Sequence, residues 1–161
     1  MKKAVLFFTV LFVLCINLLA QKEPLFCKGN GYKGYIFDTS YSVLKSIDGQ
    51  KGRANMTLDE VRSAEHILKS ELEKINQGNV NQSSGCPNIT KKLGKYWRQY
   101  FGFINTKGEK VLWVNMFWNK ELNNDAKHDL IAVSDGCSYY WNIEINLTTK
   151  KVSSLRVNGN G

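Results

Sequence analysis

The sequence predicts an α+β fold in which one amphipathic helix packs on a curved antiparallel sheet of four to five strands. Two observations lead to this prediction. A single stretch with clear helical periodicity lies between Thr57 and Gly78, and short segments rich in β-branched and aromatic residues follow it in close succession. In one of these segments, residues 139–147, apolar and polar side chains alternate, which is typical of a strand with one buried face.

The N-terminal segment has the three parts of a secretion signal. Two lysines follow Met1, residues 4–14 are almost wholly apolar, and Ala20 stands before a polar residue. The apolar run is shorter than the ~20 residues that a membrane-spanning helix needs. We therefore expect cleavage after Ala20 and export to the periplasm or the medium, with no transmembrane segment left after cleavage. An uncleaved anchor and lipid attachment at Cys15 are the alternatives.

The remaining chain divides into a short arm and one domain. Residues 21–34 are polar and interrupted by glycines, so we expect a flexible N-terminal arm after the signal peptide of residues 1–20. Residues 35–161 are long enough for a single α+β domain with its own core. The aromatic and β-branched stretch 35–47 predicts a first strand, and the glycine-rich stretch 48–52 predicts a turn.

The helix is the element with the clearest signals. Thr57 with Glu60 three positions later forms a capping box, in which each side chain accepts from a backbone N–H at the helix start. Apolar residues then recur at intervals of three and four until Gly78, which we expect to end the helix. These positions are Val61, Ala64, Ile67, Leu68, Leu72 and Ile75.

Strands and turns fill the chain after the helix. We expect strands at residues 96–105, 110–118, 129–134, 139–147 and 152–158. The order of a strand, a helix and then strands in short connections is the plan of cystatin-like folds. The cone-shaped fold of the nuclear-transport-factor-2 type shares this plan and is the alternative.

Three short stretches carry a resemblance to other proteins: residues 98–103 (RQYFGF), 135–137 (DGC) and 157–159 (VNG). In them the chain resembles a group of small exported bacterial proteins without an assigned function. The resemblance spans residues 55–160 and implies the fold more than any activity, because the shared residues are turn glycines and strand aromatics. The chain departs from the group at Met116 and Trp118, and the resemblance assigns no functional residues.

The hairpin of residues 96–118 has apolar or aromatic residues on both faces of both strands. Its register depends on the turn. A two-residue turn at 107–108 pairs Tyr100 with Asn115, whereas a type I turn over 105–108 with a glycine bulge shifts the pairing by one residue. Both registers are open from the sequence, and each places different side chains on a common face.

Two interpretations of the aromatic hairpin follow. In the first, the aromatic side chains belong to the core and residues 21–47 cover the second face, because strands buried on both sides carry apolar residues on both faces. In the second, an aromatic patch around Arg98 is exposed and binds a partner or ligand. The second interpretation predicts Arg98, Tyr100, Trp113 and Asn115 as binding residues.

Three cysteines lie after the predicted cleavage site, namely Cys27, Cys86 and Cys137. Export permits a disulfide, and the sequence leaves all three pairings open. A bridge between Cys86 and Cys137 would contribute about 4 kcal/mol to stability in the chain-entropy model. None of the spacings is typical of a zinc or redox motif.

The sequence offers few candidates for catalysis. His66 lies within the helix. His128 opens a predicted strand, and adjacent antiparallel strands could bring it near Cys137, but the two positions match across the turn only loosely, which argues against a Cys–His nucleophile pair. There are no paired carboxylates at a useful spacing, no glycine-rich phosphate loop before a helix and no metal-binding cluster. We therefore predict a protein that is not an enzyme, with no catalytic residue, no metal and no cofactor.

The charge of the chain narrows the class of partner. Its 22 basic and 14 acidic side chains give a formal charge of +8, but the lysines lie mostly at turns and ends rather than in a stripe, which argues against nucleic acid. We expect an exported, non-catalytic binding module that engages a protein partner in the envelope or the medium, for example as an inhibitor. A domain that binds a small molecule or glycan is the first alternative, and a thiol-dependent enzyme is the second.

Overall fold

The computed structural model describes residues 23–42, 50–83, 85–118 and 122–159. It shows an α+β fold built on one open sheet of seven strands. The strands are β1 (Leu25–Gly29), β2 (Tyr32–Phe37), β3 (Gln50–Ala54), β4 (Trp97–Asn105), β5 (Lys110–Phe117), β6 (Tyr140–Asn146) and β7 (Lys151–Val157). The helices are α1 (Leu58–Ile75), α2 (Ile89–Lys92) and α3 (Asn123–Ala126), with short 3₁₀ turns η1 (Leu93–Lys95) and η2 (Cys137–Tyr139). The predicted signal segment lies outside the described residues.

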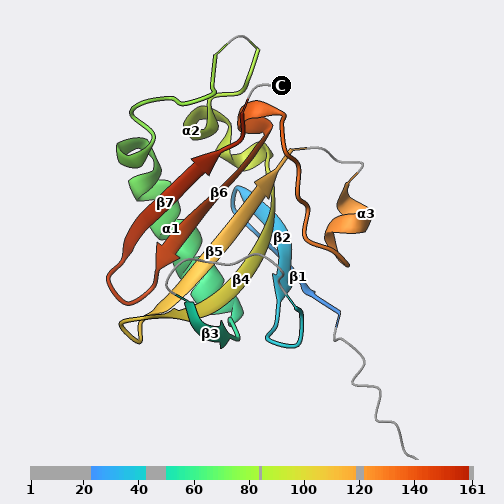
Figure 1. Ribbon diagram of the computed structural model, residues 1–161, viewed down its shortest axis with the longest axis vertical. Helices are drawn as coiled ribbons and strands as arrows, with labels where there is room; N and C mark the ends of the chain where they lie inside the picture. Colours follow the sequence, from blue (N-terminus) through green and yellow to red (C-terminus); the bar gives the residue numbers. More distant parts are fainter. Residues whose placement is uncertain (1–22, 43–49, 84, 119–121, 160–161) are drawn as a thin grey trace, which may run out of the picture.

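The sheet has the order β1-β2-β4-β5-β6-β7, and β3 pairs with the second half of β4 (Figure 1). β2 runs parallel to β4, and the other pairs are antiparallel. The sheet is therefore larger than the predicted four to five strands, and it is not wholly antiparallel. None of the helices within the described ranges is long and apolar enough to cross a membrane.

The additional strands come from segments that the sequence suggested were an arm and a turn. Residues 25–34, expected to be flexible, form β1 and the start of β2, and β3 begins at Gln50 within the expected turn. Gly34 explains the close approach of β2 to β4. A Cβ atom at this position would lie 2.1 Å from the carbonyl oxygen of Arg98, so only glycine fits.

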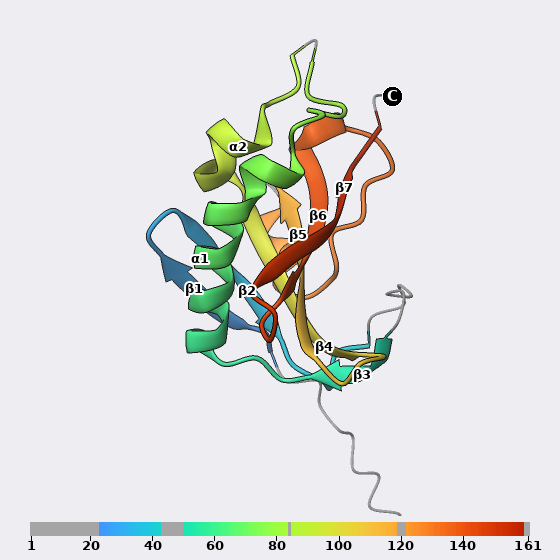
Figure 2. The same ribbon diagram turned by 90° about the vertical axis from the view of Figure 1, so that its left-hand side faces the viewer.

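Helix α1 covers one face of the sheet and packs over β6 and β7 (Figure 2). The predicted capping box is confirmed, because Thr57 accepts from the backbone N–H of Glu60 and the Glu60 side chain accepts from that of Thr57. The helix ends at Ile75 with Asn76 as its C-cap, two residues before the predicted stop at Gly78. Its apolar stripe lies against the main core of the sheet.

The hairpin of β4 and β5 is buried on both faces, as the first interpretation predicted. The face opposite α1 carries a second cluster of buried residues, made of Phe37, Phe101, Phe103, Val111 and Trp113. The expected cover by residues 21–47 is wrong in its main part, because β1 and β2 extend the sheet instead of lying over it. The described residues that pack against this cluster include Tyr41 and Leu130.

The turn between β4 and β5 settles the register. Asn105 and Gly108 close a four-residue turn, with the N–H of Gly108 donating to the carbonyl of Asn105 over 3.0 Å. Gly108 has a φ of +80°, which is the left-handed conformation that a glycine bulge requires. Tyr100 consequently pairs with Val114, so the second of the two predicted registers is the observed one.

Residues 129–134 were predicted as a strand, and this prediction is wrong. They form an irregular segment that lies on the sheet face opposite α1, between α3 and η2. Its backbone forms hydrogen bonds with side chains of the sheet rather than with a neighbouring strand. The N–H of Ile131 donates to the Gln99 side chain, and the carbonyl of Ile131 accepts from the Asn115 side chain. The apolar residues of this segment therefore contact a sheet face without belonging to the sheet.

Candidate functional site

The observed register separates the four predicted binding residues into two pairs. Arg98 and Tyr100 lie on the face that α1 covers, whereas Trp113 and Asn115 lie on the opposite face. The two pairs cannot contribute to one surface, because the sheet lies between them. They are therefore described in turn.

Arg98 is fully buried and forms an ion pair with Glu65 of α1, whose exposed fraction is 7%. Its Nε lies 3.0 Å from Glu65 Oε1, and its Nη1 donates to the carbonyl of Tyr96 over 2.6 Å. The hydroxyl of Tyr100 donates to the same carboxylate oxygen over 2.8 Å. These contacts tie α1 to β4. Arg98 and Tyr100 thus lie in the interior, where they hold the helix and are not available to a partner.

Cys27 lies beside this ion pair and is also buried. Burial raises the pKa of its thiol to about 12, and the carboxylate of Glu65 adds to the rise. Since a thiolate is the reactive form, this cysteine is protected from alkylation and oxidation in the folded chain.

We expect iodoacetamide at pH 8.5 to alkylate Cys27 far more slowly in the folded protein than in denaturant, as measured by mass spectrometry of the peptide that contains it. The raised pKa also predicts a pH dependence. The folded chain holds the thiol proton more tightly, so the stability from this group is constant below about pH 9 and falls as the pH rises toward 12. Equal alkylation rates in the two states would contradict the burial.

The opposite face is organised by the side-chain amide of Gln99, which is fully buried. Its Nε2 donates to the carbonyls of Ala126 and Asp129, over 2.9 and 2.7 Å. Its Oε1 accepts from the N–H of Ile131 over 2.9 Å and from Asn115 Nδ2 over 3.1 Å. Gln99 therefore uses its full hydrogen-bonding capacity to hold the segment that follows α3 onto the sheet.

The orientations of the Asn115 and Asn142 side chains are fixed by partner atoms that can only donate or only accept a hydrogen bond. Asn115 Nδ2 donates to Gln99 Oε1 and to the carbonyl of Ile131, which uses both of its hydrogens. Asn142 Oδ1 accepts from the indole N–H of Trp113, which can only donate, over 3.2 Å. Within the described residues, Asn115 Oδ1 accepts no hydrogen bond and Asn142 Nδ2 donates none, and both atoms are reached by solvent.

These two amides line a cavity of about 160 Å³ on this face. Its walls are Trp113, Asn115, Tyr140 and Asn142 from the sheet, residues 130–134 from the irregular segment, and Asn158. Asn115 and Asn142 are adjacent across β5 and β6, and their exposed fractions are only 8% and 9%. The lining side chains carry no formal charge. The cavity thus presents one donor and one acceptor to an uncharged group.

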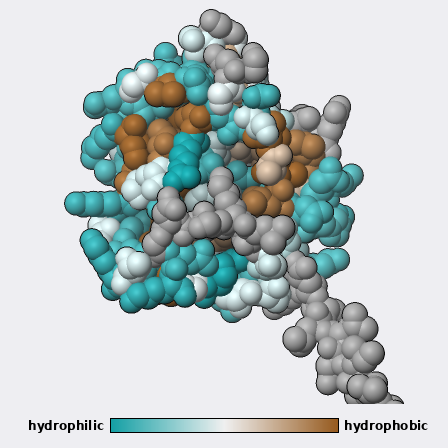
Figure 3. Space-filling model, in the orientation of Figure 1, coloured by the Kyte–Doolittle hydropathy of each residue, from teal (hydrophilic) through white to brown (hydrophobic). Residues whose placement is uncertain are grey.

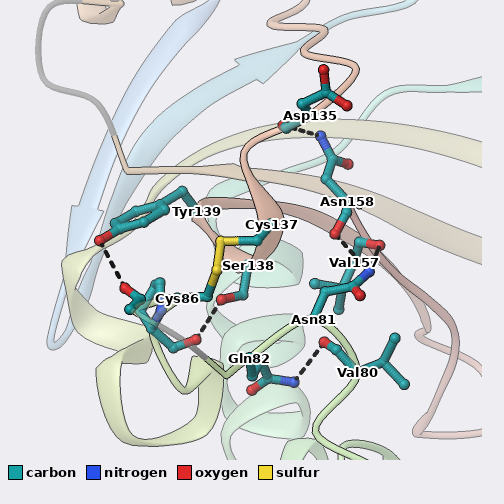
Figure 4. The surroundings of a disulfide bond; sticks show 12 residues. Val80, Asn81, Gln82, Cys86, Asp135, Cys137, Ser138, Tyr139, Val157 and Asn158 are labelled. Carbon is teal, nitrogen blue, oxygen red and sulfur yellow. Dashed lines mark hydrogen bonds between the residues drawn. A yellow bond between two sulfur atoms is a disulfide. The ribbon is translucent and has the colours of Figure 1, made fainter. Parts of the chain in front are cut away.

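The C-terminal residues hold the segment that forms one wall of the cavity, and Figure 4 shows Asn158 between Asp135 and Asn81. Asn158 Nδ2 donates to the carbonyls of Val133 and Asp135, and its own carbonyl accepts from Asn81 Nδ2 over 2.7 Å. The N–H of Cys137 donates to the carbonyl of Gly159 over 2.8 Å. Two segments far apart in the sequence therefore fix the position of residues 133–137.

The structure pairs Cys86 with Cys137, one of the three pairings that the sequence left open, and leaves Cys27 as a free thiol. In Figure 4, the disulfide joins the loop before α2 to the start of β6, where the hydroxyl of Ser138 also bonds the carbonyl of Pro87. The thiol-dependent enzyme considered above required a free Cys137, so that alternative loses its nucleophile.

A second feature of the same face lies at the edge of the sheet. Phe26, Tyr35 and Trp97 form a cluster of rings from β1, β2 and β4, and the ammonium group of Lys33 lies 4.2 Å from the centre of a Trp97 ring. Leu25 and Phe26 have exposed fractions of 53% and 49%. Within this edge cluster, Phe26 of β1 is about half exposed.

Hydrophobic residues also gather beside the cavity. Figure 3 shows two hydrophobic areas on this side of the molecule, one at the upper left and one over the segment that joins α3 to β6. Leu130, Ile131 and Val133 belong to this segment and line the cavity, and Val133 is 38% exposed. The rim of the cavity is therefore apolar on one side.

Sequence reasoning named Trp113 and Asn115 but missed Gln99, Asn142 and residues 130–134. A signal for the amides was present. Gln99 and Asn115 lie in largely apolar strands, Asn142 lies on the polar side of the alternating segment 139–147, and the three share one face once the register is known. Comparisons of the chain with models of protein families, with curated proteins and with solved structures found no match.

Proposed function

We propose that the protein is an exported, non-catalytic binding domain that holds an uncharged polar group of its ligand in the cavity over Trp113. One observation carries the proposal: Asn115 and Asn142 are about nine-tenths buried and held in orientation, and Asn142 Nδ2 and Asn115 Oδ1 make no hydrogen bond within the described residues. Neither atom is fully buried, so solvent reaches both, and a ligand that enters the cavity can bond them in place of water.

The composition of the cavity favours binding over catalysis. Its lining includes no histidine, cysteine or carboxylate among the described residues, so no such base lies in the wall to activate the hydroxyl of Ser134 or Tyr140. The amides of the wall can only donate and accept hydrogen bonds. Export rests on the basic and apolar pattern of residues 1–20.

A second candidate function is the binding of a protein partner at the sheet edge. Among the strands that the structure describes, β1 pairs with β2 alone, so its outer edge presents backbone groups that a partner strand could bond, beside the half-exposed Leu25 and Phe26. The cystatin-like plan, in which such a domain would act as an inhibitor, stays a prediction. Loss of partner binding on Phe26→Ser, with no effect of a cavity variant, would favour this candidate.

The experiment for the first candidate is a titration of ¹⁵N-labelled protein with a panel of uncharged sugars, polyols and simple amides. We expect at least one member to shift the side-chain signals of Asn115, Asn142 and the indole of Trp113 in a saturable manner. The variant Asn142→Asp keeps the oxygen that Trp113 bonds but removes the free donor, so it should weaken binding by about tenfold or more.

Asn30→Asp is the matched control, because it makes the same chemical change at an exposed position outside the cavity. It should bind as the parent protein does. A panel in which no compound moves the cavity signals, or in which Asn142→Asp binds as well as the parent, would contradict the proposed function.

A further inference from the structure

We infer that the outer edge of β1 binds an acidic polypeptide segment in an extended conformation, which joins the sheet as a further strand. This inference rests on the second candidate function, the binding of a protein partner at this edge, and adds the chemistry of the partner to it. Three properties of the edge carry the inference: a regular backbone, exposed apolar side chains, and a positive charge without a carboxylate beside it.

The two ends of the sheet differ in how well they can accept a further strand. β1 lies at one end and β7 at the other (Figure 1). The pairing of β7 with β6 shifts register between Asn142 and Glu144, and Ser154 has a φ of +52°, so a bulge interrupts the β7 edge. β1 pairs with β2 over five consecutive residues without a shift. Because bulges protect an edge from further pairing, β1 is the end of the sheet that is open to a partner strand.

Apolar side chains flank this edge on both faces. Leu25 and Phe26 are neighbours in β1 and about half exposed, and successive side chains of a strand point to opposite faces. Phe26 lies on the face opposite α1, where its ring contacts those of Tyr35 and Trp97. A strand added beside β1 would remove part of both exposed side chains from water, which favours its binding beyond the backbone hydrogen bonds.

The charge of the edge indicates which side chain the partner supplies. Lys28 shares a face with Phe26, two positions earlier, and lies directly opposite Lys33 of β2. Like charges in this position destabilise a strand pair. Lys33 places its ammonium group over Trp97 of β4, on the side away from β1. Neither lysine forms an ion pair with an acidic side chain of the described residues, so a carboxylate on the partner strand would be the first beside Lys28.

These positions define a short pattern in the partner. An aromatic or aliphatic side chain belongs opposite Phe26 and a carboxylate opposite Lys28, two positions apart in the partner because both point to one face. A second copy of β1 does not fit, since it would bring another Lys28 and Lys33 to this face in place of a carboxylate. The net charge of +8 likewise favours the approach of an acidic chain over self-association.

The test is a titration of the ¹⁵N-labelled mature protein with the peptide acetyl-Glu-Val-Phe-Val-Glu-amide. Its phenylalanine lies two positions from a glutamate in both chain directions, so the peptide fits in either orientation. We expect it to shift the backbone signals of residues 25–29 in a saturable manner. At low ionic strength it should bind about fivefold more tightly than acetyl-Lys-Val-Phe-Val-Lys-amide. The acidic peptide N-methylated at its phenylalanine and both valines keeps its charges but loses backbone donors, and it should not bind at this edge.

A charge exchange identifies the residue that selects the acidic peptide. Lys28 is exposed, so Lys28→Glu should fold as the parent protein does and should bind the lysine peptide more tightly than the glutamate peptide. Lys107→Glu is the matched control, because it makes the same change at an exposed residue of the turn between β4 and β5. Both variants lower the net charge equally, yet Lys107→Glu should keep the preference for the acidic peptide.

Equal binding of the two peptides, or an unchanged preference in Lys28→Glu, would overturn the acidic assignment and leave the second candidate function standing. An N-methylated peptide that binds as tightly as the parent peptide would show that charge attracts it without strand pairing, which would overturn the inference. A dimer that buries residues 25–29 without any peptide would make a second copy the occupant and would also overturn it. A titration in which no peptide shifts residues 25–29 contradicts both the inference and the second candidate function, and the cavity is tested separately with uncharged compounds.

Discussion

Replacement of Arg98 by alanine is expected to lower the free energy of unfolding by about 3–5 kcal/mol, because it leaves a buried carboxylate without its partner. Glu65 would remain between α1 and β4 with an exposed fraction of only 7% and would keep only the hydroxyl of Tyr100 as a neutral donor. The guanidinium also bonds the carbonyls of Tyr96 and Gly31, which would lose their donors. Denaturant titration followed by circular dichroism measures the loss.

A double variant separates the cost of leaving one charge unpaired from the net contribution of the ion pair to the free energy of unfolding. Replacing both partners, with Arg98→Met and Glu65→Leu, removes both charges and fills the space with apolar atoms, so most of the lost stability should return. Tyr100 would still lose an acceptor, and a residual deficit of about 1 kcal/mol is expected from that. A loss below about 1 kcal/mol for Arg98→Ala alone would show that the ion pair is not buried as described.

Removal of the disulfide is the second large effect, and we expect it to cost about 4 kcal/mol. Cys86 and Cys137 are 51 positions apart, so the bond closes a long loop and reduces the conformational freedom of the unfolded chain. The double variant Cys86→Ala/Cys137→Ala should therefore unfold at a clearly lower denaturant concentration than the parent, measured with no reductant present.

The reductant itself supplies the control for this prediction. Dithiothreitol should destabilise the parent protein to the level of the double variant and should leave the double variant unchanged. Because Cys137 also begins the turn that leads into β6, loss of the bond should in addition increase amide exchange around Ser138 and Tyr139. A parent protein that resists denaturant equally with and without reductant would contradict the assigned role of the bond.

Short sequence motifs predicted the elements that are determined by contacts between residues close together in the sequence. Thr57 and Glu60 determine the start of α1 through contacts within one turn, and Gly108 permits the bulge that sets the hairpin register. The parallel pairing of β2 with β4 depends on residues more than 60 positions apart, and no local pattern encodes it. The glycine that permits this approach, Gly34, was interpreted as a sign of flexibility.

The site could be predicted only in part for a related reason. Trp113 and Asn115 were chosen for their residue type on an aromatic hairpin, whereas Asn142 becomes part of the cavity only through the pairing of β5 with β6. Arg98 was chosen as the one charge in an apolar strand. That pattern indicates a functional residue or a buried ion pair equally well, and Glu65 on α1 decides between them.

The position of β4 has a consequence for the order in which the newly made chain can fold. β2, β3 and β5 all pair with β4, and α1 packs on β6 and β7, which are made last. A nascent chain that ends before β6 has made its long helix and the β4 residues that bond Glu65, but not the β6 and β7 surface on which the helix also packs. Isolated helices of this length are only marginally stable, so we expect complete burial of α1 only when almost the whole chain has been synthesised.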